Sequence, residues 1–124
     1  MIDKKEAIRQ YKNTLQPMGI YRITNSVNGK IFIGSSLNVD KIFNRILFQL
    51  KHNSYGNKDL QEDFNLNGES NFSFEIIDHL EPKKDKEQGY DYTDDLQVLE
   101  GMWLDKLQPY EKIGYNSRKT IKTI

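Results

Sequence analysis

The chain contains no cysteine, so disulfide bonds and thiolate metal sites are excluded. It also lacks an apolar run of the roughly 18 residues that cross a membrane, and its first residues lack the apolar stretch of a signal peptide. These absences predict a cytoplasmic protein with no membrane partner. Acidic and basic residues balance at 18 each, which leaves no net charge. Because phosphate neutralisation supplies most of the nonspecific affinity for nucleic acid, any basic surface must be local.

What the chain does contain suits one folded domain: 124 residues, of which 36% are hydrophobic. Near its start, Asp3 and Glu6 have the spacing of a capping box. Three residues with apolar bodies then recur at helical intervals: Ile8, Tyr11 and Leu15. We therefore expect an N-terminal helix over 1–17, a domain over 18–117 and a basic tail over 118–124.

A β-hairpin is predicted around Asn28-Gly29, which is the strongest short signal for this motif. Its strands are expected over 19–24 and 30–34. A two-residue turn would place Ile23 opposite Gly34. Because side chains alternate along a strand and opposite residues share a face, four residues are expected on one face: Tyr21, Ile23, Phe32 and Gly34. An aromatic beside a glycine in each strand indicates a site rather than packing alone.

Apolar residues at helical spacing predict three helices after the hairpin. The segment 39–51 carries a complete apolar stripe: Val39, Ile42, Phe43, Ile46, Leu47 and Leu50. A second helix turns Leu60 and Phe64 inward, and alternating apolar residues then predict a strand over 71–78. The last helix is expected to run from a Thr93 cap to about Gln108, before a proline.

Glu100 is the unexpected residue of the last helix. Four apolar residues form one face there: Leu96, Leu99, Trp103 and Leu107. At about 100° per residue, Glu100 falls within about 50° of the middle of that face. A carboxylate in apolar surroundings is costly unless it is paired, hydrogen-bonded or bound to a metal. It is either an edge glutamate that reaches solvent or pairs with Lys or Arg, or a metal ligand or acid–base group; a hard oxygen ligand suits magnesium or manganese.

Taken in order, these segments resemble the GIY-YIG nuclease family over nearly the whole chain after residue 18. Gly19-Ile20-Tyr21 is similar to the first family motif. Phe32-Ile33-Gly34 is similar to the second motif, with Phe in place of its Tyr. Further segments match in the family's order: Asn28-Gly29-Lys30, Gly34-Ser35-Ser36, 57–61, 100–104 and Gly114-Tyr115-Asn116.

The resemblance implies an α+β fold, a three-stranded antiparallel sheet flanked by helices, to which the N-terminal helix is an addition. It also implies hydrolysis of DNA phosphodiester bonds with one divalent ion, Mg²⁺ or Mn²⁺. Glu100 would hold the metal, and the Tyr21 hydroxyl would position or deprotonate the attacking water. Four residues would support the site: Gly19, Phe32, Gly34 and Asn116. An arginine on the helix after the hairpin would stabilise charge on the phosphate.

That helix departs from the family pattern. The family arginine falls at Ile42, and the histidine that often follows it falls at Ile46. Loss of a group that stabilises transition-state charge typically costs about 10²–10³ in rate. Arg45 lies one turn beyond Ile42 and about 60° round the helix. It either returns its long side chain to the same spot or is a solvated surface arginine.

Three functions compete on this sequence. The first is a metal-dependent DNA endonuclease, weak or dependent on a partner. The second is a degenerate GIY-YIG module that binds nucleic acid or protein without cleaving, which Ile42 and the neutral charge favour. The third is a domain that binds only another protein. The sequence leaves the oligomeric state and the DNA target open.

Overall fold

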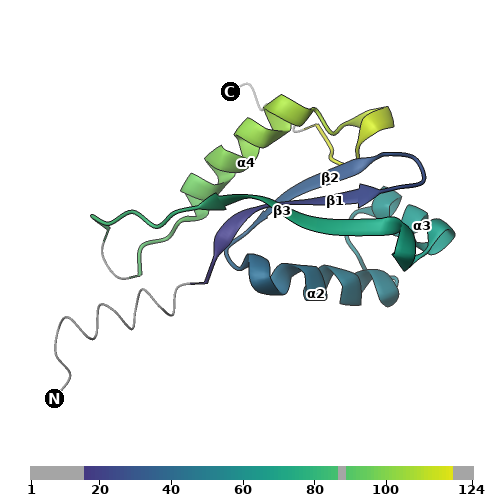
Figure 1. Cartoon of the computed structure of the whole chain (residues 1–124), viewed down its shortest axis with the longest axis horizontal. Coiled ribbons are helices and arrows are strands. Elements are labelled where there is room, and N and C mark those ends of the chain that lie inside the picture. The colour runs from purple at the N-terminus through teal and green to yellow at the C-terminus, as the bar shows by residue number, and fades with distance from the viewer. Residues whose placement is uncertain (1–15, 87–88, 119–124) are drawn as a thin grey trace, which may run out of the picture.

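The computed structural model describes residues 16–86 and 89–118, in which one sheet is covered by helices on both faces (Figure 1). The elements in chain order are β1 (Met18–Asn25), β2 (Ile31–Ser36), α2 (Val39–Lys51), α3 (Lys58–Asn67), η1 (Glu69–Asn71), β3 (Phe72–Leu80), α4 (Thr93–Leu107) and η2 (Glu111–Ile113). The helix predicted at the N-terminus lies outside the described residues, apart from residues 16 and 17, and so does the basic tail beyond Arg118.

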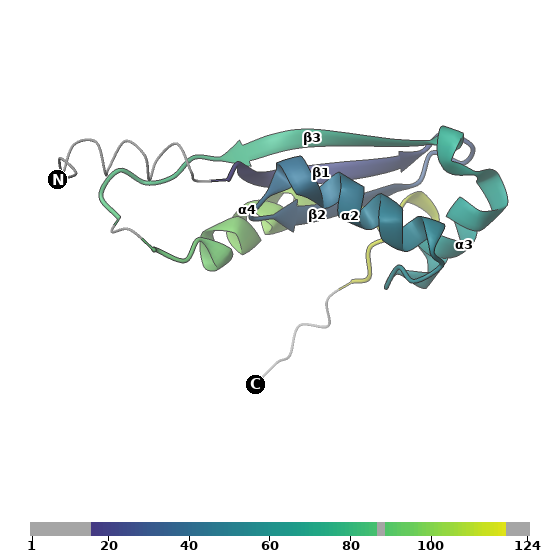
Figure 2. The same ribbon diagram turned by 90° about the horizontal axis from the view of Figure 1, so that it is seen from below.

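The sheet is antiparallel, with β1 in the centre and the strand order β2-β1-β3. Figure 1 shows α4 on one face of this sheet and α2 on the other. In the view from below, α2 lies in front of the strands (Figure 2). The predicted α+β architecture, a three-stranded antiparallel sheet flanked by helices, is therefore confirmed.

Alternation along the strands gives the molecule two apolar cores. The α2-side core contains eight buried residues: Tyr21, Ile23, Ile46, Leu50, Leu60, Phe64, Phe72 and Tyr115. The α4-side core is built on Ile20, Ile33 and Leu96, with the remaining apolar face of α4 packed against them. Each large aliphatic side chain buried in this way contributes about 1.5–3 kcal/mol of transfer free energy.

The helices begin and end where local chemistry allows. The side chain of Asn57 accepts a hydrogen bond from the Leu60 N–H (3.1 Å), which caps α3. The prediction that Thr93 caps α4 is wrong, because Thr93 is already the first helical residue. The preceding turn is held instead by the Asp91 carboxylate, which accepts from the Thr93 N–H at 3.0 Å and from its hydroxyl at 2.6 Å.

The hairpin differs from the prediction by two residues. Ile23 pairs with Phe32, and Gly34 pairs with Tyr21. The loop is longer than a two-residue turn because the Asn25 side chain accepts from the Val27 N–H (3.0 Å). Since the shift is even, the four residues expected on one face still share it. Within residues 16–86 and 89–118, every helix is too short or too polar to cross a bilayer.

Candidate active site

Tyr21, on the central strand, is the middle of the candidate site. Its phenol lies over Gly34 of β2, so a methyl group added at Gly34 would overlap the hydroxyl and the ring. Tyr21 is 6% exposed, and the ring of Phe43 stands edge-on to it at 5.8 Å. Because Gly34 has no side chain, the Tyr21 side chain of β1 can lie across β2 at this position.

A β-bulge sets the direction of Tyr21. Ile20 pairs with Asp78, but the next residue, Tyr21, pairs with Ile76, which leaves Ile77 unpaired. Bulges of this kind bend a strand and re-aim the side chains beside them. At the same place the Asp78 carbonyl approaches Gly19 so closely that a Cβ atom would collide with it. The two predicted supporting glycines, Gly19 and Gly34, thus permit close approach on opposite sides of the same tyrosine.

Charged and polar groups converge on the Tyr21 hydroxyl. Burial raises the pKa of Tyr21 well above its ordinary value. The Tyr55 phenol and the Glu100 carboxylate raise this pKa further, whereas the Arg45 guanidinium lowers it. Because such influence falls with distance, Glu100 and Arg45 both lie within electrostatic range of the hydroxyl. Side chains from α2 and α4 therefore both act on a hydroxyl of β1.

Glu100 and Arg45 come from helices that lie on opposite faces of the sheet (Figure 1). Glu100 is half-buried and Arg45 is exposed. The ion pairs within the described part of the chain involve other carboxylates: Glu69, Glu75, Asp95 and Glu111. Pairing with a described Lys or Arg thus does not account for Glu100. Arg22 forms one of those pairs, with Glu75, on the face opposite Tyr21.

Asn116 joins the C-terminal segment to the edge strand beside Gly34. Its Oδ1 accepts from the Ile33 N–H (2.9 Å), and its Nδ2 donates to the Ile33 carbonyl (2.8 Å). The Tyr115 N–H also donates to the Ile31 carbonyl (2.8 Å). Asn116 thus takes the place of a neighbouring strand for Ile33.

Tyr55 is the residue that the sequence did not single out. It lies in the loop between α2 and α3, and its half-buried ring stands edge-on to Phe32, with the ring centroids 6.4 Å apart. Burial raises the pKa of Tyr55 to about 12, and its hydrogen bond with Tyr21 opposes that rise. Periodicity gives no information on a loop residue, so the missing hydroxyl of Phe32 was the only signal pointing to a second tyrosine.

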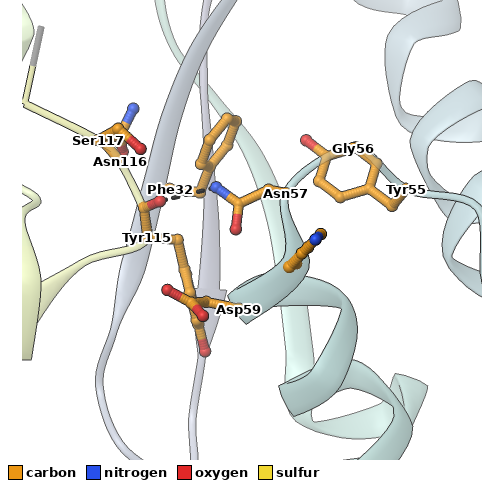
Figure 3. A pocket seen from close by; sticks show the side chains of 9 residues that line it. Phe32, Tyr55, Gly56, Asn57, Asp59, Tyr115, Asn116 and Ser117 are labelled. Atoms are coloured by element: carbon orange, nitrogen blue, oxygen red, sulfur yellow. Dashed lines mark hydrogen bonds between the residues drawn. The ribbon is translucent and has the colours of Figure 1, made fainter.

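A cleft of about 590 Å³ opens beside these residues. Figure 3 shows Tyr55 on one side and the C-terminal residues Asn116 and Ser117 on the other. Asn57 lies between them, and its side chain donates to the Tyr115 carbonyl (2.7 Å). The cleft is lined by both polar and aromatic groups, which suits a ligand with phosphates and bases.

Comparison with known proteins gives one clear likeness. The catalytic domain of the homing endonuclease I-TevI superposes with a TM-score of 0.63 and 27% identity, over 82% of this chain and 99% of that domain. A point mutant of the same catalytic domain, described as an intron endonuclease, gives 0.66 and 25% over 85% and 98%. I-TevI is a GIY-YIG homing endonuclease. This chain has the fold of a GIY-YIG catalytic domain. No protein-family model and no curated protein matches the sequence.

Within this GIY-YIG fold, the helix positions expected for arginine and histidine are filled by core residues. Ile46 is 3% exposed in the α2-side core, and Ile42 packs against that core. A charged side chain in place of Ile46 would be buried with its charge. Arg45, one turn beyond Ile42, is the cation whose charge reaches Tyr21.

The donor set of this GIY-YIG site suits a lightly held metal ion. The described residues contain no group of three metal-binding side chains, and neither His52 nor His79 belongs to a cluster. Glu100 offers one hard carboxylate. Magnesium keeps several waters and often binds proteins through one or two carboxylates together with substrate phosphates. A single protein carboxylate fits that mode.

Proposed function

We propose that the chain is a divalent-metal-dependent endonuclease that hydrolyses DNA phosphodiester bonds. The observation that supports this proposal is the electrostatic influence of both Glu100 and Arg45 on the Tyr21 hydroxyl, within a GIY-YIG fold. A phenol, a carboxylate and a guanidinium are the three groups that water activation, metal binding and phosphate stabilisation need.

In this proposal each residue has one task. The Tyr21 oxygen accepts a hydrogen bond from the attacking water and orients it toward phosphorus. Its raised pKa keeps the phenol protonated at neutral pH, so Tyr21 orients the water rather than removing its proton as a phenolate. Glu100 would hold Mg²⁺ or Mn²⁺, which when bound supplies Lewis-acid stabilisation of phosphate charge. The exposed Arg45 guanidinium would contact a phosphate oxygen and offset its developing charge.

The substrate class follows from charge and shape. Since the chain carries no net charge, DNA must be held by local cations. Lys58, at the start of α3, lines the cleft, and the Arg45 guanidinium of α2 acts on the Tyr21 hydroxyl. Few phosphate contacts mean weak binding that salt reduces further. We therefore expect DNA binding and cleavage to be strongest at low ionic strength.

The test is nicking of supercoiled plasmid at low salt with Mg²⁺ or Mn²⁺. Glu100→Gln should lower the rate at least about 10²-fold, because loss of a direct ligand should exceed the 10–100-fold cost of disturbing an outer-shell partner. Arg45→Ala should lower it about 10²–10³-fold. Two substitutions of exposed residues serve as matched controls, Glu62→Gln and Lys41→Ala, and both should cleave at the wild-type rate.

A second function has its own support. The apolar packing of Ile42 and Ile46 and the missing hydroxyl of Phe32 favour a GIY-YIG module that binds nucleic acid or a protein partner without cleaving. Saturable DNA binding by a wild-type protein that leaves plasmid intact with either metal would favour this module over the nuclease.

A further inference from the structure

Two tyrosines share the aromatic surface of Phe32. Tyr21 of the central strand lies 6.3 Å from the Phe32 ring, and Tyr55 of the loop between α2 and α3 lies 6.4 Å from it. These are ring-centroid distances within the range of favourable aromatic pairs. Phe32 has no hydroxyl, so the polar atoms beside Tyr21 on this side come from Tyr55.

The loop that carries Tyr55 is held in place by a buried amide. The Gln61 Oε1 accepts from the Tyr55 N–H (3.0 Å), and its Nε2 donates to the Leu50 carbonyl (2.9 Å) and to Asn65 Oδ1 (3.0 Å). Gln61 is only 7% exposed. A buried amide whose three hydrogen bonds join the loop to both flanking helices restricts where the Tyr55 ring can lie.

We infer that Tyr55 supplies the second tyrosine hydroxyl that Phe32 lacks, and that it acts as a positioning residue for Tyr21. This inference rests on the proposed nuclease function. When the Tyr21 hydroxyl donates a hydrogen bond to Tyr55, the lone pairs of the Tyr21 oxygen are left to accept from the attacking water. The two phenols are coupled, since each affects the pKa of the other.

The contact itself can be tested without metal or DNA. In the full chain carrying tyrosine labelled with ¹³C at the ring Cζ, Tyr55→Phe should move the Tyr21 resonance. Tyr90→Phe is the matched control. Tyr90 lies in the loop before α4, and the substitution removes a hydroxyl that donates to the Asp95 carboxylate at 2.9 Å. This control should leave the Tyr21 resonance in place. A Tyr21 resonance unmoved by Tyr55→Phe would overturn the inference.

The catalytic consequence is tested by single-site substitution and rescue in the plasmid assay. Tyr55→Phe should lower kcat about tenfold, the value of one hydrogen bond, with KM unchanged. Phe32→Tyr, added to that variant, should restore most of kcat because it returns a hydroxyl to the neighbouring position. Wild-type kcat in Tyr55→Phe, or a double variant as slow as the single one, would overturn the inference.

The two assays separate the two proposals. Active wild-type enzyme that is insensitive to Tyr55→Phe removes the role of Tyr55 and leaves the nuclease proposal standing. Inactive wild-type enzyme overturns both the nuclease proposal and the positioning role of Tyr55 in cleavage. In that case a shifted Tyr21 resonance still identifies the hydroxyl contact as a property of the fold.

Discussion

Gly19 and Gly34 are required for space rather than for backbone conformation. The positive-φ glycines in the described part of the chain are others: Gly29, Gly68 and Gly89. At Gly19 the carbonyl of Asp78 occupies the position of a Cβ atom, and at Gly34 the phenol of Tyr21 does. Each glycine of the two motifs therefore leaves room for another group, a backbone carbonyl at Gly19 and an aromatic ring at Gly34.

The first prediction concerns Gly34→Ala. Its methyl group would force the Tyr21 ring away, and overpacking of this kind typically costs about 1–3 kcal/mol. We expect urea denaturation to show that loss of unfolding free energy, with a much smaller loss when Tyr21 is already alanine. Gly56→Ala is the control, because a Cβ atom there meets nothing within 4 Å. Equal losses with and without the Tyr21 ring would contradict the steric explanation.

At this scale the sequence was informative for strands and silent for loops. Alternation placed Tyr21 and Gly34 on one face, and a register shift of two residues does not change the face on which a side chain lies. It could not identify Tyr55, whose position depends on the hydrogen bonds of Gln61 across three segments. The roles assigned to Tyr21, Arg45 and Glu100 stay predictions until activity is measured.

Among the elements, the segment 114–116 acts as a partial fourth strand. Gly114 lies in a parallel bridge with Ile31, and Asn116 completes the row with its amide. The Tyr115 side chain fastens this segment to the rest of the molecule, because its hydroxyl donates to Asp63 (2.6 Å) and accepts from Asn25 (3.0 Å). These contacts hold β2, the strand that contains Gly34, in place along its outer edge.

The second prediction concerns Asn116→Ala. The substitution removes two hydrogen bonds and leaves the Ile33 N–H and carbonyl without their partner, at a cost of about 1–3 kcal/mol. We expect faster hydrogen exchange at the Ile33 amide together with that loss of stability. The exposed residue Asn44 of α2 provides the control, and Asn44→Ala should change neither quantity. Unchanged exchange at Ile33 in Asn116→Ala would contradict the assignment.

The elements themselves were largely predictable. The stripe over Val39–Lys51 gave the bounds of α2, and alternation gave β3 to within two residues. The hairpin register was not predictable from Asn28-Gly29 alone. The Asn25 and Asn28 side chains both accept backbone N–H groups in the loop, which lengthens it beyond a two-residue turn.

On the scale of the whole molecule, the candidate site depends on both cores. Arg45 belongs to the helix that packs on the α2-side core, and Glu100 to the helix that packs on the α4-side core. Tyr21 belongs to the α2-side core and lies on β1, the strand that contributes to both cores. Loosening either core should therefore separate Arg45 or Glu100 from Tyr21 before the chain unfolds. We expect cleavage activity to be lost at a lower urea concentration than the one that unfolds the β-sheet.

The third prediction is a loss of stability in alkali. Burial, followed by the hydrogen bond to Asp63, raises the pKa of Tyr115 to about 12. Unfolded tyrosine ionises near pH 10. The stabilisation that the protonated Tyr115 hydroxyl gives to the folded state is therefore complete below about pH 10 and is lost as pH rises toward 12. One such proton changes the unfolding free energy by at most about 1.4 kcal/mol per pH unit.

Urea titrations between pH 9 and 12 measure this dependence. Tyr115→Phe should be less stable at neutral pH but should lose stability less steeply above about pH 10. Tyr110→Phe, which removes a hydroxyl from a neighbouring half-buried tyrosine, should keep the wild-type slope. An identical slope in Tyr115→Phe and the wild type would exclude Tyr115 as its source.

The cover that the C-terminal segment gives to β2 also limits how two copies of this protein could associate. Bridges and the Asn116 amide occupy β2 from Ile31 to Ile33, which leaves only three residues of that outer edge. Within the described residues, the long edge of β3 has no such cover. Sheet extension through β3 would consume the one long uncovered edge among the strands of residues 16–86 and 89–118. Such growth ends at a pair and cannot continue into a fibre.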